Sequence, residues 1–329
     1  IFNPDRTGLI AADRAVASAA DTVLIPEVAK RVELQLAAED DAFTLNDDGD
    51  ILWQDAKVGR LRKGPEVLRP RVEVRADSRL GPDLKLKMSN RLKAWSERRI
   101  LSTLGAIVQI EKSSLSGAAR GLAYQIAEAL GSLPRHGAET QVKALSAEDH
   151  KAMTKAGIRF GLDFLYVPEL LKSEPIRLRA ILWSIYNALD PRPDSPPAGR
   201  VSFPTVKEAP SGFYLACGFK PVKGTAYRVD MVERFAAEVR RLLRDNAKHL
   251  PPSHLSPLGI GADSAIDLLK ALGFNSFLEE DGISIATKSK QKKGKPKGQP
   301  KKQPKKKRQA RIANPDSPFA KLKELVKLD

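Results

Sequence analysis

The 329-residue sequence contains a single cysteine, and this scarcity limits the covalent chemistry that the chain can support. One cysteine forms no intrachain disulfide and supplies no multi-cysteine zinc site. Such usage suits the reducing cytoplasm, which is where we expect the protein to reside. Cys217 ends the apolar run Phe213–Cys217. A small buried core residue is therefore a better interpretation of Cys217 than a nucleophile.

Long apolar runs are also absent from the sequence. A membrane-spanning helix needs about 20 consecutive apolar residues, and no stretch of the chain reaches that length. Residues Ile1–Asp5 carry neither the basic start nor the apolar segment of a secretory signal peptide. Position 1 is not methionine either, so we expect that sequence is missing upstream. The sequence predicts no membrane span.

Motifs for nucleotide hydrolysis, metal binding and nucleophilic catalysis are missing as well. No stretch has the glycine, lysine and serine or threonine spacing of a P-loop. The fragment Gly259–Gly261 is too short for a dinucleotide fingerprint and predicts a loop before a helix. The four histidines lack metal-ligand spacing, and paired carboxylates such as Asp47 and Asp48 fall in predicted turns. We therefore predict no catalytic residue, no metal ligand and no cofactor for this chain.

The pattern of apolar residues predicts an α+β fold that is mostly helical. Across residues 82–131, apolar side chains recur every three or four positions, as on one face of a helix. The clearest β signal is the Asp-Gly turn Asp47–Asp50 between two apolar-rich segments, and a further short strand is expected over residues 57–61. We expect small helical modules with short β-hairpins, followed by a disordered Lys/Pro-rich segment near the C-terminus.

Capping residues and short runs place further elements. Ser146 resembles the N-cap of a helix, and Asp230 can cap a helix that reaches Leu243. Residues 212–228 suggest two short strands, and Pro191–Pro197 reads as a stiff connector. The predicted parts are a helical segment 1–40 that continues from upstream sequence, a mixed β-hairpin and helical domain 41–190, a small α+β module 200–287, a basic linker 288–312 and a short amphipathic tail 313–329.

Basic residues are concentrated near the C-terminus. Thirteen of them lie between Lys288 and Arg311, with no acidic residue among them. Subtracting these thirteen charges from the formal net charge of +16 leaves only +3 for the rest of the chain. The predicted nucleic-acid-binding residues are Lys288, Lys290, Lys292, Lys293, Lys295, Lys297, Lys301, Lys302, Lys305, Lys306, Lys307, Arg308 and Arg311.

The basic segment has the composition of a flexible polyanion-binding chain. Spaced lysines attract nucleic acid by releasing condensed counterions, without reading its sequence. No aromatic residue lies within residues 288–312, so base stacking is not built into the segment. We interpret it as a capture device for RNA or DNA. A solubilising tail and a contact with an anionic membrane surface are the alternative interpretations.

Several segments together resemble a known family. They are Leu45–Leu61, Leu68–Val72, Leu115–Leu130, Ala156–Lys172, Arg177–Trp183, Gly212–Tyr214, Arg228–Met231 and Pro315–Phe319. In this order they resemble the C-terminal half of the alphaproteobacterial helicase-related proteins, which are superfamily II ATP-dependent helicases related to the mitochondrial degradosome RNA helicase. The resemblance covers most of residues 25–329, and residues 2–20 depart from the family pattern.

The resemblance implies a parent protein with two RecA-like lobes upstream that use ATP and translocate on RNA or DNA. No motif of those lobes has a counterpart in this sequence, so ATP and magnesium are expected only for the missing lobes. The leading hypothesis is a non-catalytic, nucleic-acid-binding accessory region of an ATP-dependent helicase-like protein.

Two alternatives remain open. A protein-interaction or assembly module with a non-specific polyanion-binding tail is the first of them. Its contact with upstream helicase lobes or a protein partner is expected through a helix-spaced apolar stripe formed by Phe319, Leu322, Leu325 and Val326. An enzyme that works unaided is the second, and only Cys217 and unplaced carboxylates favour it.

Overall fold

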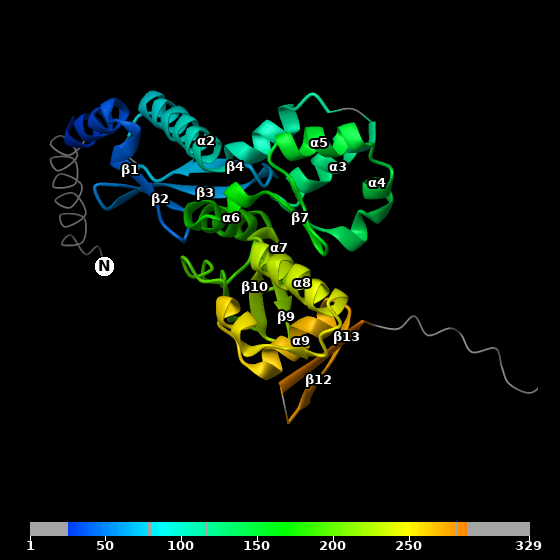
Figure 1. The fold of residues 1–329 in the computed structure, drawn as a ribbon. Coiled ribbons are helices and arrows are strands. Elements are labelled where there is room, and N and C mark those ends of the chain that lie inside the picture. The colour runs from blue at the N-terminus through cyan, green and yellow to red at the C-terminus, as the bar shows by residue number, and fades with distance from the viewer. Residues whose placement is uncertain (1–25, 78–79, 116, 281, 288–329) are drawn as a thin grey trace, which may run out of the picture. The chain divides into compact units, whose positions relative to one another are not determined.

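The structure is a computed structural model that describes residues 26–77, 80–115, 117–280 and 282–287. Contacts divide the chain into residues 1–288 and 289–329, and all described residues belong to the first unit. The predicted fold class is confirmed, because this part of the chain is α+β with a helical majority and small antiparallel sheets (Figure 1). No described helix combines the length and the apolar character needed to cross a bilayer.

The strands of the described residues form small sheets in which every pairing is antiparallel. The first sheet has the order β1 (Phe43–Leu45), β2 (Asp50–Trp53), β3 (Ala56–Glu66) and β4 (Arg69–Val74). The second has the order β5 (Ser132–Pro134), β7 (Phe164–Tyr166) and β6 (Arg159–Phe160). The third has the order β8 (Ser202–Pro204), β10 (Thr225–Arg228) and β9 (Phe219–Val222). The fourth has the order β11 (His249–Leu250), β13 (Gly282–Thr287) and β12 (Phe274–Glu279).

The helices range from one turn to thirty-one residues. Residues 26–37 are helical. The other α-helices are α2 (Pro82–Lys112), α3 (Gly117–Glu128), α4 (Glu139–Lys143), α5 (Ala147–Lys155), α6 (Ser173–Tyr186), α7 (Ser211–Ala216), α8 (Val229–Arg244) and α9 (Ala262–Ala271). Short 3₁₀ turns lie at Asp40–Ala42, Arg135–Gly137, Pro168–Leu171, Pro252–His254 and Ser256–Leu258.

The first sheet begins with the hairpin that the Asp-Gly turn predicts. β1 and β2 pair in antiparallel register on either side of the turn. The side-chain oxygen of Asn46 accepts a hydrogen bond from the amide of Asp50 at 2.7 Å. Gly49 has a φ of +73°, a left-handed conformation that glycine adopts without a steric penalty. The predicted turn at Asp47–Asp50 is therefore confirmed.

The sheet extends further than the sequence predicts. The strand expected over residues 57–61 continues to Glu66 as β3 and turns back into β4. β4 contains Pro70, which has no N–H to donate to a strand ladder and therefore argues against a strand in the sequence. β4 lies at the edge of the sheet, where a proline is tolerated.

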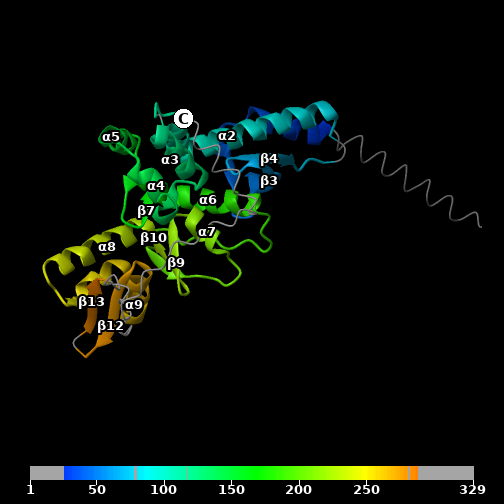
Figure 2. The same ribbon diagram turned by 90° about the vertical axis from the view of Figure 1, so that its right-hand side faces the viewer.

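Two helices account for the predicted helical stretch 82–131. α2 has a break at Leu104, where φ is −112° and ψ is 19°. Its apolar face packs on the first sheet, and a Cβ added at Gly59 of β3 would lie 2.7 Å from a methyl carbon of Leu92. In both views the first sheet lies between α2 and α6 (Figures 1 and 2). Glycine at position 59 thus lets α2 approach the strand closely.

The middle of the chain follows the capping signals closely. Ser146 accepts a hydrogen bond from the amide of Asp149 at 3.0 Å, and the Asp149 carboxylate accepts one from the amide of Ser146 at 3.1 Å. This reciprocal capping box starts α5 and confirms the predicted N-cap. After α3, Leu130 and Gly131 both have positive φ, at 52° and 86°.

The last part of the described chain differs in detail from the sequence prediction. Residues 212–228 contain the two expected strands, β9 and β10, but Phe213 lies in the short helix α7 before them. Asp230 lies inside the first turn of α8, and its N-cap residue is Arg228. Asp230 accepts hydrogen bonds from the Arg228 guanidinium at 2.7 and 2.9 Å, so it orients the cap residue instead of capping the helix itself.

The core continues across the predicted connector Pro191–Pro197. Ile176 and Ala180 of α6 belong to one buried apolar cluster with Phe213 and Phe219, which follow the connector. The modules predicted at 41–190 and 200–287 therefore share buried side chains. The connector is a surface loop between packed elements.

Candidate functional site

The predicted nucleic-acid-binding residues, the thirteen basic positions from Lys288 to Arg311, lie outside the described residues. The predicted partner stripe also lies outside them; its residues are Phe319, Leu322, Leu325 and Val326. The candidate site within the described residues therefore consists of side chains that the sequence did not predict as functional.

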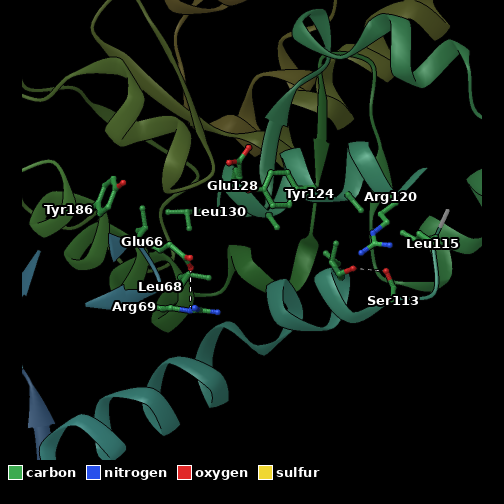
Figure 3. Close-up of a pocket in the computed structure, with 14 residues that line it drawn as sticks. Glu66, Leu68, Arg69, Ser113, Leu115, Arg120, Tyr124, Glu128, Leu130 and Tyr186 are labelled. Carbon is green, nitrogen blue, oxygen red and sulfur yellow. Dashed lines mark hydrogen bonds and ion pairs between the residues drawn. The ribbon is translucent and has the colours of Figure 1, made fainter. Parts of the chain in front are cut away.

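A groove with a volume of about 590 Å³ lies beside the tip of the β3–β4 hairpin. The end of α2, the exposed side of α3 and the end of α6 contribute its other walls (Figure 3). Its charged and aromatic lining residues are Glu66, Arg69, Arg120, Tyr124, Glu128 and Tyr186. This volume lies within the roughly 300–1,000 Å³ range that is typical of small-ligand sites.

Helix α3 presents three of these side chains because of their spacing. Arg120, Tyr124 and Glu128 follow one another at intervals of four, so they share one face of the helix. Tyr124 is 59% exposed, whereas the adjacent Ala123 and Ala127 are buried. The groove therefore has an exposed aromatic ring beside an apolar floor made of small side chains.

The hairpin wall carries a weakly held guanidinium. Arg69 pairs with Glu66 at 3.3 Å across the turn between β3 and β4, and both side chains are largely exposed. An ion pair of this kind contributes only about 0–1 kcal/mol in water. In Figure 3, Arg69 lies to the left of Tyr124 and Arg120 lies to its right. A bound anion can therefore draw Arg69 from its pair at little cost.

A strip of basic residues leads from the groove along β3. The ammonium of Lys63 lies 5.1 Å from the ring centroid of Tyr186, which lines the groove at the end of α6. Arg62 and Arg71 occupy directly opposite positions of β3 and β4, and both are exposed. Like charges that face each other across two strands destabilise the pairing. The Arg62 guanidinium is held by Glu73 at 2.5 Å, which offsets part of that cost.

Two guanidinium groups converge farther along the strip. Arg192, in the connector after α6, and Arg60 on β3 both donate to the backbone carbonyl of Asp48, Arg60 at 3.4 Å. Burial lowers the pKa of Arg192, and the positive charge of Arg60 lowers it further, while Asp48 and Asp50 act in the opposite direction. Two guanidinium groups thus share one carbonyl oxygen, so their N–H donors outnumber the acceptor sites of that oxygen.

The carboxylate of Asp50 anchors this end of the strip. Its side chain is 1% exposed, and Lys57, Arg60 and Arg75 lie 2.8, 3.4 and 3.5 Å from its oxygens. Burial raises the pKa of Asp50, but the hydrogen bond from Lys57 and the two arginines outweigh it, and the net pKa is lowered. One buried negative charge therefore fixes three cationic side chains on the sheet.

The arrangement has the chemistry of a binding surface for a charged, ring-containing ligand. We call Arg60, Arg62, Lys63 and Arg192 the basic strip. The groove is the pocket lined by the residues given above. Guanidinium and ammonium groups bind phosphate oxygens, and tyrosine rings stack against flat heterocycles. Within the described residues, no three His, Cys, Asp or Glu side chains are placed to hold a metal ion.

Comparison with known proteins assigns no family. No protein-family model, no curated protein and no solved structure matches the chain.

A local charge count would have revealed the basic strip. Residues 57–75 contain seven basic and two acidic side chains. The net charge of everything outside the basic C-terminal segment is close to zero, and this average over a long stretch conceals the basic hairpin. The groove itself has no sequence signal, because Tyr124 and Tyr186 are 62 positions apart in the chain and belong to two different helices.

Proposed function

We propose that this chain is a non-catalytic, nucleic-acid-binding accessory region of an ATP-dependent helicase-like protein. The observation that carries the proposal is the run of thirteen basic residues from Lys288 to Arg311 without an acidic one. Such a run supplies affinity for RNA or DNA through counterion release. The resemblance to helicase-related proteins gives the helicase context.

The folded part adds independent support for the proposal. Its basic strip gathers cationic side chains from β3 and from the connector, and a groove with two tyrosines lies at one end. Basic side chains beside exposed aromatic rings are typical of surfaces that bind single-stranded nucleic acid. Capture by the basic segment 288–312 and placement by the strip and groove are then complementary roles.

The test is direct binding of the full chain to labelled RNA and DNA over a series of salt concentrations. A second protein carries glutamine at all thirteen basic positions of residues 288–311, and we call it the tail-neutral variant. We expect the affinity of the unaltered chain to fall steeply with salt, because each phosphate contact contributes about −0.9 to the logarithmic slope on duplex DNA. The tail-neutral variant should bind more weakly, with a shallower slope.

Two results would contradict the proposal. One is an unaltered chain that binds neither RNA nor DNA at low salt. The other is an affinity that does not change with salt, since binding through phosphates must release counterions. An anionic lipid vesicle serves as the competing polyanion, and a preference for vesicles over nucleic acid would favour the membrane alternative.

The second candidate function is a protein-interaction or assembly module, and strand β12 favours it. β12 lies at the edge of its sheet and carries Phe277 and Leu278, which are 62% and 59% exposed. Exposed apolar residues on an edge strand are suited to pairing with a further strand. Replacing Phe277 by Lys should abolish capture of a protein partner if this function holds, and should leave nucleic-acid binding unchanged.

A further inference from the structure

We infer that the groove beside the β3–β4 hairpin holds an unpaired nucleotide of a single strand, with its base on Tyr124 and its phosphates on the basic strip. This inference rests on the proposed function and assigns a site and a strand preference to the folded part. It concerns residues other than the basic C-terminal segment.

The aromatic side of the site is placed by α3 and α6. Tyr124 is 59% exposed on the face of α3 that borders the groove, and Tyr186 lines the same groove from the end of α6. Buried Ala123 and Ala127 add no bulk next to the Tyr124 ring. A heterocyclic base can therefore lie against this ring and rest on an apolar floor.

The phosphate side of the site is placed by the hairpin and the connector. The Lys63 ammonium lies 5.1 Å from the Tyr186 ring centroid, so a cation is positioned at the entrance to the groove. Arg69 on the hairpin tip forms an exposed ion pair with Glu66. Arg60 and Arg192 crowd one backbone carbonyl farther along β3. Positive charge thus continues from the groove toward the start of the sheet.

The acidic residues of the groove limit where phosphates can lie. Glu66 is already paired with Arg69. Glu128 comes from α3 and lies apart from Arg69 in Figure 3, on the side of the groove that borders Tyr124. Phosphates are repelled from that side and attracted to the hairpin side. Charge complementarity therefore gives the bound nucleic acid one path, with its sugar-phosphate backbone along β3 and one base turned toward α3.

The same geometry selects single strands over duplexes. A paired base in a duplex has both faces covered by its stacked neighbours, whereas an unpaired base exposes a face to a tyrosine ring. A groove of about 590 Å³ accepts a ligand of small-molecule size. An unpaired base can enter such a groove, but a base pair within a helix cannot.

The experiment uses the tail-neutral variant of the full chain, so that capture by the basic C-terminal segment does not mask the groove. Its ligands are fluorescein-labelled oligothymidine and oligouridine of about 15 nucleotides and a duplex of the same length, because stacking sites of this class cover about 4–16 nucleotides. Tyr124→Ala removes the ring and Tyr124→Phe keeps it. Phe277→Ala is the matched control, since Phe277 is a similarly exposed ring on β12, outside the groove.

We expect Tyr124→Ala to weaken single-strand binding by about tenfold, within the range measured when a stacking residue is lost. Tyr124→Phe and Phe277→Ala should bind like the parent. Lys63→Gln should reduce the logarithmic salt slope by about 1, as expected for the loss of one phosphate contact. Lys143→Gln is its control, because Lys143 is an exposed lysine on α4 that pairs with Glu139.

A second measurement identifies which part of the protein contacts the nucleic-acid base. Irradiation with 5-bromouracil-substituted oligonucleotide should cross-link the strand to the α3 peptide that contains Tyr124, and mass spectrometry identifies the adduct. The inference is overturned if Tyr124→Ala binds like the parent while still folded by thermal unfolding, or if the duplex binds as tightly as the single strand. An unaltered chain that fails to bind any nucleic acid would instead reject the proposed function. Binding that is lost entirely in the tail-neutral variant would reject this site alone.

Discussion

The guanidinium of Arg179 donates a hydrogen bond to the backbone carbonyl of Cys217 at 3.0 Å, although the two residues lie on opposite sides of the connector. The same side chain donates to the carbonyls of Leu130, Leu170 and Pro175, and it is completely buried. Burial lowers the pKa of Arg179 to about 10, so the group stays charged at neutral pH. One cation therefore joins the ends of several chain segments through their backbone carbonyls.

Removing this cation should destabilise the fold strongly. Arg179→Met fills part of the space but leaves three or more buried carbonyls without donors, and each such loss costs about 1–3 kcal/mol. We expect a decrease of at least about 3 kcal/mol in the free energy of unfolding, measured by urea denaturation. Arg240→Met, on the exposed side of α8, is the control and should change stability by less than about 0.5 kcal/mol. Equal effects of the two substitutions would contradict the structural role of Arg179.

The thiol of Cys217 should be unreactive in the folded protein. The side chain is completely buried, and burial raises its pKa to about 12, although the positive charge of Arg179 acts in the opposite direction. Thiolate is the reactive form, so it is scarce even at pH 9. We expect no labelling by a thiol reagent under native conditions and one label per chain in denaturant. Fast native labelling would show that the thiol is accessible, and the sequence interpretation as a core residue would then be wrong.

The stability of the fold should be sensitive to a substitution of Glu233 that removes only one hydrogen-bond acceptor. Its carboxylate accepts hydrogen bonds from the amides of Leu162, Asp163 and Phe164 at 2.5, 2.8 and 2.7 Å. Burial raises its pKa, and the three amides oppose that effect. Glu233→Gln keeps the shape but replaces one acceptor oxygen by an NH₂ group, which leaves a buried amide unpaired. We expect a loss of about 1–3 kcal/mol in thermal or urea unfolding.

Gly161→Ala provides an independent test of the same contact. A Cβ at this position would lie 2.2 Å from the Glu233 carboxyl carbon, so the carboxylate must move. We expect a destabilisation close to that of Glu233→Gln, and less than additive losses when both changes are combined, because both break one network. Fully additive losses would indicate that the two residues act separately.

Asp50 should make the fold sensitive to acid. Its net pKa is lowered by Lys57 and the two arginines despite its burial, so its contribution to stability is present above the unfolded-state pKa near 3.9 and is lost as pH falls through the folded pKa. Asp50→Asn should cost about 3 kcal/mol at pH 7, as for a buried ion pair that loses one partner. The difference in unfolding free energy between the two proteins should shrink below pH 4. A difference that stays constant from pH 7 to pH 3 would contradict this assignment.

Local signals in the sequence predicted local structure well. The Asp-Gly turn, the capping box at Ser146 and the periodic apolar residues of α2 each depend on neighbours within about one helical turn. The strand β4 was not predicted, because Pro70 disfavours a strand unless the strand lies at a sheet edge, and edge position is a tertiary property. Phe213 lies in a helix, although the sequence around it suggested a strand.

The candidate site could not be predicted in the same way. Arg60 and Arg192 are far apart in the sequence and meet at the carbonyl of Asp48. Tyr124 and Tyr186 likewise reach one groove from two helices. Neither pair leaves a periodic or spacing signal, and net charge over a long window conceals the basic hairpin. The basic segment 288–312, in contrast, is visible in composition alone, and its role stays a prediction.

The bonds that span the connector determine how the protein responds to a break in its chain. Residues 197–200 are exposed, whereas Arg179 and Glu233 bond to backbone groups on the far side of that loop. A protease that cuts there removes none of these bonds, so the two fragments should remain one particle on a sizing column and separate only in denaturant. The gene can then be divided at this loop, and the two halves, expressed together, should assemble into one folded protein.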